Sequence, residues 1–252
     1  MSILLSCQKV FSSFIDIIYP PRCHICQSFL ADDYNNNGTR PICQDCLNNF
    51  SGIESPFCPV CGTPFESMEE EDHLCEACLR KRPFYDIIAA PYLYEGGIME
   101  AIHLLKYAGK THLVESLGPL LASFALEKLD MTDGCLIMPV PLHPKRLRER
   151  GFNQSLLLAR VLATLLDVEL DFLSLRRIRY TQPQTGLKTD ERRKNVSRAF
   201  ELTEKIKWKG KTVILVDDVA TTGNTLNECA RVLKRAGCAK VFCLVLARAS
   251  GF

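Results

Sequence analysis

The chain has 252 residues, 47% of them hydrophobic, which is enough for one sizeable core and a small additional module. Its 31 basic and 29 acidic residues nearly balance, so the net charge of +2 excludes a global electrostatic attraction to nucleic acid. Charge-dependent binding must therefore come from local clusters of residues.

Residues 1–18 place apolar side chains at helical spacing: Leu4, Cys7, Phe11, Phe14 and Ile18. The segment lacks a basic amino-terminal stretch and contains Asp16, so we expect a docking helix rather than a signal peptide. No stretch approaches about 18 uncharged apolar residues, so no transmembrane span is expected. The chain has 13 cysteines and no predicted leader, which favours a reducing, cytoplasmic location with thiols as metal ligands, because disulfides rarely persist there.

Eight cysteines before residue 80 form four CxxC pairs in two sets. The first set has 16 residues between its pairs and the second has 13: Cys23, Cys26, Cys43 and Cys46, then Cys58, Cys61, Cys75 and Cys78. A CxxC turn places two thiolates along one edge of a tetrahedron, so each set predicts a closed four-thiolate zinc site. Sequential pairing is favoured over cross-bracing because a linker with Ser55 and Pro56 separates the sets. Redox CxxC pairs are the alternative, but no thioredoxin-like pattern surrounds them.

The segment that carries these pairs is rich in Asn, Pro and Glu and poor in apolar residues, so it needs metal ions to fold. We therefore predict a front module over residues 1–82 with two structural zinc ions, and a second domain over residues 83–252. Replacing Cys23 or Cys58 should unfold the front module and leave the later domain folded. Four later cysteines are predicted to be small buried hydrophobic residues: Cys135, Cys229, Cys238 and Cys243.

Beyond residue 83 the hydrophobic pattern alternates between strands and helices. Strands are predicted at 87–94, 135–140, 213–216 and 241–246, with a weaker signal at 173–178. Helices are predicted at 98–107, 113–128, 154–166 and 225–236. This alternation predicts an α/β fold in which right-handed crossovers build a parallel sheet flanked by helices. Ligands bind at the carboxyl ends of such strands, where three loops should meet.

The most informative segment is VILVDDVATTGNTL, residues 213–226. Its apolar start predicts a strand buried on both faces, with Asp217 and Asp218 at the carboxyl end. A loop and helix start follow that predict a phosphate site: Ala220, Thr221, Thr222, Gly223, Asn224 and Thr225. Because carboxylates repel phosphate, the acidic pair should bind sugar hydroxyls and a divalent cation, which indicates a phosphorylated ribose. An ordinary strand–turn–helix with surface aspartates is the alternative.

The second loop follows strand 135–140 and contains Lys145, Arg146, Arg148 and Arg150. Four cations beside a phosphate pocket suit a pyrophosphate, and the alternatives are a solvated basic turn or a phosphate contact to nucleic acid. Two further residues each have two interpretations. Asn153 is either a ligand or the N-cap of the next helix, and Lys106 is either a ligand or a charge at a helix C-terminus.

The third loop, residues 179–195, is polar and basic with few apolar residues to anchor it. We expect it to be mobile. A disordered basic connector without a role in binding is the alternative for the same segment.

Residues 213–226 resemble the phosphoribosyl-pyrophosphate signature of type I phosphoribosyltransferases. Three further segments and the four CxxC pairs resemble the ComF family of competence-associated, phosphoribosyltransferase-like proteins: LKYAG at 105–109, MPVPLHPKRLRERGFNQS at 138–155 and TQPQTGLKTDERRKNV at 181–196. The resemblance covers residues 19–248. It implies a type I phosphoribosyltransferase-like sheet preceded by an amino-terminal double zinc ribbon. It also implies that the acidic pair binds the ribose hydroxyls and that the next loop binds the 5′-phosphate.

The family's pyrophosphate loop leaves strand 135–140, although Leu142, His143 and Pro144 replace the acidic and small residues of the amidotransferase relatives. Related transferases close a loop like the third one over the substrate and exclude water. The resemblance implies phosphoribosyl pyrophosphate with Mg²⁺ as ligand and a role in DNA uptake during natural transformation. Single-stranded DNA would contact the basic loops, with Phe152 and Tyr180 for stacking. An active phosphoribosyltransferase that releases pyrophosphate remains the alternative, and no segment has a recognisable acceptor-binding pattern.

Overall fold

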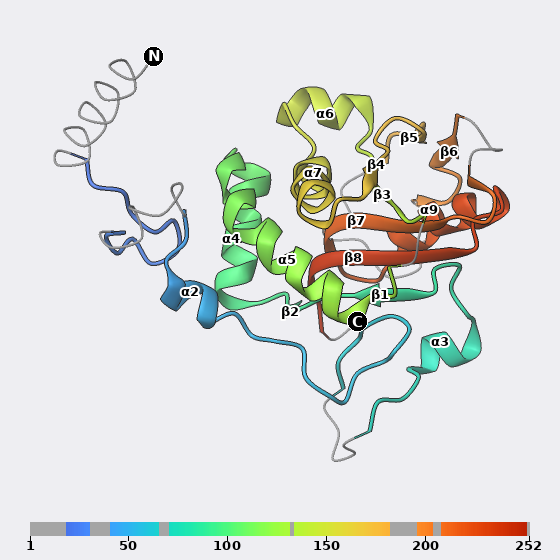
Figure 1. The fold of residues 1–252 in the computed structure, drawn as a ribbon, viewed down its shortest axis with the longest axis horizontal. Helices are drawn as coiled ribbons and strands as arrows, with labels where there is room; N and C mark the ends of the chain where they lie inside the picture. The colour runs from blue at the N-terminus through green and yellow to red at the C-terminus, as the bar shows by residue number, and fades with distance from the viewer. Residues whose placement is uncertain are drawn as a thin grey trace. The chain divides into compact units, whose positions relative to one another are not determined.

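The computed structural model describes residues 19–30, 41–65, 71–131, 134–181, 196–203 and 208–250 (Figure 1). Contacts divide the chain into two units, Met1–Asn49 and Phe50–Phe252. The predicted docking helix in residues 1–18 and residues 182–195 of the predicted third loop lie outside the described residues. No helix in the described ranges is both long enough and apolar enough to span a bilayer.

The described part of the first unit is organised around its four cysteines and contains one short helix, α2 (Gln44–Asn48). The chain turns tightly around the first CxxC pair, where the Gln27 amide donates to the Cys23 carbonyl at 2.9 Å. Ile42 is fully buried and Leu30 is 8% exposed. With so little apolar burial, the thiols must supply most of the unit's cohesion when they bind metal.

The second unit is built on a parallel sheet with the strand order β1-β8-β7-β3-β4, and β2 also pairs with β8. The strands are β1 (Ile87–Ala89), β2 (Tyr92–Leu93), β3 (Leu136–Pro139), β4 (Glu169–Leu170), β7 (Thr212–Ala220) and β8 (Lys240–Arg248). Residues 213–216 are completely buried, as expected for a central strand covered on both faces. The predicted α/β architecture is confirmed.

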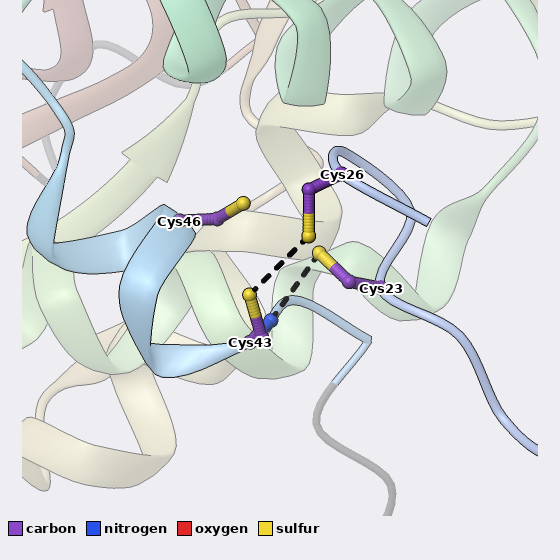
Figure 2. Close-up of side chains that lie close together, drawn as sticks. All are labelled: Cys23, Cys26, Cys43 and Cys46. Carbon is purple, nitrogen blue, oxygen red and sulfur yellow. Dashed lines mark hydrogen bonds between the residues drawn. The ribbon is translucent and has the colours of Figure 1, made fainter. Parts of the chain in front are cut away.

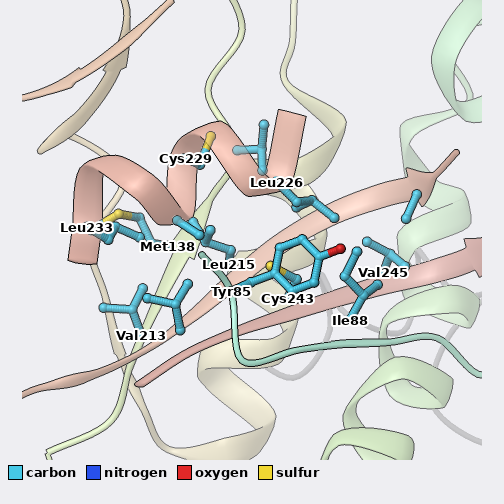
Figure 3. Packing of buried hydrophobic residues seen from close by; sticks show 14 of the residues in the cluster. Tyr85, Ile88, Met138, Val213, Leu215, Leu226, Cys229, Leu233, Cys243 and Val245 are labelled. Carbon is cyan, nitrogen blue, oxygen red and sulfur yellow. The ribbon is translucent and has the colours of Figure 1, made fainter. Parts of the chain in front are cut away.

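Helices cover both faces of this sheet (Figure 1). One face contacts α5 (Val114–Lys128) and α7 (Gln154–Leu166), which also pack on each other. The other face contacts α9 (Asn224–Arg235), whose buried residues share a core with alternate residues of β7 and β8 (Figure 3). The remaining helical segments are α3 (Glu76–Arg80), α4 (Gly96–Tyr107), η2 (Thr111–Leu113) and α6 (Pro144–Arg150).

The second cysteine set shares the core on the α9 side of the sheet. Cys58 is fully buried, and Cys58, Cys61 and Cys78 lie in one apolar cluster with Val213 and Leu233. The Ile88 amide of β1 donates to the Val60 carbonyl at 2.8 Å. The predicted domain boundary at residue 82 stays a prediction, but the expectation that replacing Cys58 would spare the later domain does not fit this shared core.

Three predicted features differ from the structure. The segment 144–150, predicted as a loop, forms the helix α6, because Pro144 suits the first helical turn and the His143 side chain caps it. Asp217 and Asp218 lie within β7 and not beyond its end, because β8 continues the ladder to the pair Ala220↔Arg248. The strand signal at 173–178 is β5 (Leu175–Arg177), which pairs antiparallel with β6 (Phe200–Leu202) in a separate two-stranded sheet.

Candidate functional site

The first four cysteines bring their sulfur atoms together, as Figure 2 shows. All four lie within 4.8 Å of one another, and Cys26 Sγ is 3.6 Å from Cys43 Sγ. Tetrahedral zinc with Zn–S bonds of about 2.3 Å requires S–S separations of about 3.8 Å. The Cys23 sulfur also accepts hydrogen bonds from the backbone amides of Ile25 and Cys43, each with an N–S distance of 3.4 Å. This donor set therefore fits a structural zinc ion.

The second set forms an equivalent group, with Cys61 Sγ 3.6 Å from Cys75 Sγ. Burial of the Cys61 thiol opposes ionisation, but hydrogen bonds with Thr63 and the charge of Arg248 lower its pKa to about 7. A thiolate near neutral pH is the form that binds zinc. The two groups confirm the predicted sequential grouping of the cysteines, and both fit a structural zinc ion.

The acidic pair of β7 contacts two polar side chains from other elements. Lys106, at the end of α4, places Nζ 2.8 Å from Asp218 Oδ1, and the two side chains are 17% and 4% exposed. Ser155, in the first turn of α7, donates from Oγ to Asp217 Oδ1 at 2.7 Å. The second oxygen of Asp218 is buried and has no hydrogen-bond partner among the described residues. That oxygen is free to bind a ligand or a cation.

Burial and the neighbouring Asp218 carboxylate together raise the pKa of Asp217 to about 7. Burial by itself would lower the pKa of Lys106, but the carboxylates of Asp218 and Asp217 outweigh it and raise that pKa. Lys106 is therefore a permanent cation at neutral pH, while Asp217 is poised between its two forms. A bound divalent cation would hold Asp217 ionised.

The predicted phosphate loop forms the turn between β7 and α9. Gly223 has φ of 70°, a left-handed conformation in which an added Cβ would lie 3.0 Å from Ile88 Cδ1. Two buried groups at this turn, Thr222 Oγ1 and Asn224 Nδ2, have no hydrogen-bond partner among the described residues. Both can donate, and the N-terminus of the 12-residue helix α9 adds backbone N–H groups. These groups together suit a phosphate.

The basic helix α6 divides its cations between two environments. Arg146 and Arg150 are half-buried, four residues apart, and line the cavity described below. Arg150 also donates to Gln154 Oε1 at 2.7 Å. Lys145 and Arg148 are exposed, and the Lys145 ammonium lies 4.6 Å from the centre of the Tyr180 ring. Helical periodicity, which the prediction of a loop did not include, separates these two pairs.

A cavity of about 460 Å³ joins these groups at the carboxyl edge of the sheet. Its charged walls come from four separate parts of the second unit: Lys106, Arg146, Arg150, Arg177, Asp217 and Asp218. Thr221 and Thr225 line it as well, and a smaller hollow beneath them is lined by Ala220, Gly223 and Asn224. The volume lies in the usual range for small-molecule sites, and the four cations outnumber the two carboxylates, which favours an anionic ligand.

The structure brings most of the predicted site residues to this cavity, but not all of them. Lys145 is absent from its walls, and Asn153 acts as the N-cap of α7, accepting from the Ser155 amide at 3.1 Å. Sequence reasoning missed Ser155 and Arg177 as site residues. Ser155 lies in a quoted motif, so its position two residues after the cap was available as a signal, whereas Arg177 had no local signal.

A family model described as Double zinc ribbon domain matches residues 14–79, and one described as Phosphoribosyl transferase domain matches residues 153–251. The DNA utilization protein YhgH of Escherichia coli (strain K12) is 33% identical over 231 residues, covering 89% of this chain and 96% of that protein. Competence protein F of Haemophilus influenzae is 31% identical over 221 residues, covering 84% of this chain and 91% of that protein. Competence protein ComFC of Bacillus subtilis (strain 168) is 28% identical over 199 residues, covering 78% of this chain and 79% of that protein.

Proposed function

The chain belongs to the ComF family of phosphoribosyltransferase-like proteins, and from that membership we propose that it binds phosphoribosyl pyrophosphate with Mg²⁺ in the cavity at the edge of the sheet. One observation carries the proposal. The acidic pair of β7 and the arginines of α6 line one cavity. Asn224 of α9, whose buried Nδ2 has no hydrogen-bond partner among the described residues, lines the adjoining smaller hollow.

Each group has a distinct role in this proposal. The loop 221–225 holds the 5′-phosphate, because its buried donors Thr222 Oγ1 and Asn224 Nδ2 have no other partner in the part of the chain that the structure describes. Arg146 and Arg150 hold the pyrophosphate, for which guanidinium groups are well shaped. Asp217 and Asp218 bind the ribose hydroxyls and the Mg²⁺ ion, since carboxylate oxygens are hard ligands that this ion prefers. Lys106 offsets the charge of Asp218 when the cation is absent.

We further propose that the protein handles single-stranded DNA during uptake in natural transformation. Two relatives are named competence proteins and one a DNA utilization protein. Lys145 and Arg148 are exposed on α6, outside the cavity, and Tyr180 offers a stacking surface beside Lys145. A cytoplasmic location is part of this proposal, because eight ligand thiols must stay reduced to hold zinc.

Calorimetry with phosphoribosyl pyrophosphate and Mg²⁺ tests the ligand. The double variant Asp217→Ala with Asp218→Ala should bind at least about 100-fold more weakly, because each lost charged contact is worth roughly 1.5–3 kcal/mol. Asp130→Asn is the matched control, since its carboxylate is 66% exposed on the surface, and it should bind as the parent does. Unchanged affinity in the double variant would place the ligand elsewhere.

A second candidate function is catalysis, the transfer of the phosphoribosyl group to an acceptor with release of pyrophosphate. It is favoured by a neighbouring groove of about 750 Å³ between α6, α7 and β5, which shares His143 and Arg177 with the sugar cavity. Its apolar lining includes Phe152 and Phe172 and can accommodate a base. Incubation with a panel of bases and amines, followed by measurement of pyrophosphate, tests this. If no acceptor stimulates the release of pyrophosphate, ligand binding without catalysis remains the proposed function.

A further inference from the structure

We propose that Arg248 links the second cysteine cluster to the phosphate loop, so that zinc at this cluster sets the shape of the loop and is coupled to phosphosugar binding. Arg248 is thus a positioning residue for the ligand site. The inference rests on the proposed function for its ligand, whereas the link itself can be tested without any ligand.

Arg248 ends β8 and its guanidinium group is buried, with the residue only 5% exposed. On one side, Nη1 donates to the Ala220 carbonyl at 2.9 Å and to the Thr221 carbonyl, which are the first residues of the phosphate loop. On the other side, Nε donates to the Cys61 carbonyl at 2.8 Å. Nη2 completes the set with a 2.7 Å bond to Thr63 Oγ1. One planar group therefore bonds to both segments.

The acceptors of Arg248 are neutral carbonyl and hydroxyl oxygens. A buried cation that loses such bonds leaves its charge unsolvated, which is costly. The loop and the cysteine turn must therefore both stay within hydrogen-bonding distance of the same guanidinium group. If the loop or the cysteine turn moved away, Arg248 would lose hydrogen bonds, so the shared guanidinium group opposes movement of either segment.

Thr63 extends the link to a metal-binding atom. Its Oγ1 accepts from Arg248 and lies 3.1 Å from Cys61 Sγ, to which it can donate. Groups that hydrogen-bond to a metal ligand orient it and tune its affinity for the metal. The sequence of contacts from Cys61 Sγ through Thr63 and Arg248 to the Thr221 carbonyl is continuous.

Direct packing connects the same two segments by a second route. At Gly62, which follows Cys61, an added Cβ would lie 2.8 Å from the Ile88 carbonyl, so the cysteine turn lies directly on β1. Ile88 also approaches the phosphate loop. An added Cβ at Gly223 would lie 3.0 Å from Ile88 Cδ1 and 3.3 Å from the Tyr85 hydroxyl oxygen. Figure 3 shows Tyr85 and Ile88 in the buried cluster that also contains Leu226 of α9. Ile88 therefore lies close to both the cysteine turn and the loop.

Hydrogen exchange of the full, zinc-loaded protein without ligand is the first test. Arg248→Lys keeps the charge but cannot reach all of these acceptors, so amides of residues 219–226 should exchange roughly tenfold faster. Thr63→Val removes only the hydroxyl and is the milder variant if Arg248→Lys folds poorly. Amides of α7 serve as the internal control and should keep their rates. Unchanged exchange of residues 219–226 in both variants would overturn the link.

Equilibrium competition for zinc with a chelating dye is the second test. Coupling is reciprocal, so saturating phosphoribosyl pyrophosphate should raise the affinity for one of the two zinc ions several-fold. Thr63→Val and Arg248→Lys should lose this effect. Cys26→Ser, which alters the cluster of the other unit, should retain the effect for the single remaining ion. Identical zinc affinities with and without ligand, in protein that binds the ligand by calorimetry, would overturn the coupling. If no ligand binds at all, the proposed function fails and hydrogen exchange still decides the link.

Discussion

At the scale of single residues, the acidic pair shows how two adjacent carboxylates coexist in a buried position. Asp218 is compensated by Lys106, while Asp217 accepts from the Ser155 hydroxyl and from the Asp218 amide. The compensation is incomplete, because burial and the neighbouring carboxylate still raise the pKa of Asp217 to about 7. A site that holds such strain without ligand is well suited to a cation that relieves it.

Asp217→Asn should stabilise the protein markedly at pH 8 and less at pH 5, where the folded carboxyl is still largely protonated. The folded pKa of about 7 exceeds the usual unfolded value, so the protonated carboxyl favours folding. That contribution is complete below about pH 4 and is lost as the pH rises through about 7. Thermal unfolding of the parent and the variant at both pH values measures this contribution. Asp130→Asn, at an exposed carboxylate, is the control. A stability difference between parent and Asp217→Asn that does not change with pH would contradict the raised pKa.

Lys106→Met should lower the free energy of unfolding by about 2–4 kcal/mol, because it leaves Asp218 buried without its cation. Lys128→Met is the matched control. Its ammonium pairs with Glu127 on the surface, where both side chains are more than half exposed, so its effect should stay within about 0.5 kcal/mol. Urea unfolding at pH 8 gives both values. Equal losses in the two variants would mean that the pair with Asp218 contributes no more than a surface contact.

At the level of secondary-structure elements, the conformation of α6 decides how its four cations are distributed. As a loop, its four cations would be equivalent, whereas the helix directs Arg146 and Arg150 to the cavity and leaves Lys145 and Arg148 exposed. Gly151, with φ of 83°, ends the helix and allows the chain to enter α7 directly. The same short helix can therefore serve two anionic ligands on separate faces.

Two double variants of α6 should separate these ligands. Arg146→Ala with Arg150→Ala should weaken phosphoribosyl pyrophosphate binding by about 10- to 100-fold or more. Lys145→Ala with Arg148→Ala should leave that affinity within about twofold and reduce the slope of log affinity for single-stranded DNA against log salt by roughly 1.4. Calorimetry measures the affinity for phosphoribosyl pyrophosphate, and salt titrations measure the slope for single-stranded DNA. If each double variant weakens the binding of both ligands equally, the helix has one shared binding surface.

At the scale of the whole chain, the two cysteine clusters serve different units. The first groups four thiols of the smaller unit, while the second lies in the apolar cluster beneath the sheet. A metal in the second cluster therefore stabilises the unit that carries the cavity. Loss of either metal should have consequences confined to its own unit.

Metal analysis should return two zinc ions per chain, and single replacements should separate them. Cys23→Ser should lower the content to one ion and leave the thermal transition of the larger unit within a few degrees of the parent. Cys58→Ser should lower that transition markedly, because the residue is fully buried in the core of the sheet. Equal transitions in the two variants would mean that the second cluster does not support the larger unit.

Features that depend on local spacing could be predicted from the amino-acid sequence. The CxxC intervals gave both zinc sites and their pairing, since a four-thiolate site needs only two tight turns and a linker of suitable length. Hydrophobic periodicity placed α7 and α9 almost to the residue. The run from Val213 to Leu226 marked the central strand and the phosphate loop, because burial on both faces requires continuous apolar residues there.

Contacts between distant residues, in contrast, depend on how the elements pack in three dimensions. Lys106 reaches Asp218 across more than 100 positions of the chain, and Arg248 reaches Cys61 across 187, because parallel strands bring the ends of separate crossovers to one edge. No local pattern encodes such pairs. The length of β7 likewise depends on the ladder that β8 provides, and the exposure of each α6 cation depends on what its face packs against. These long-range contacts determine which charged residues line the cavity beside the loop.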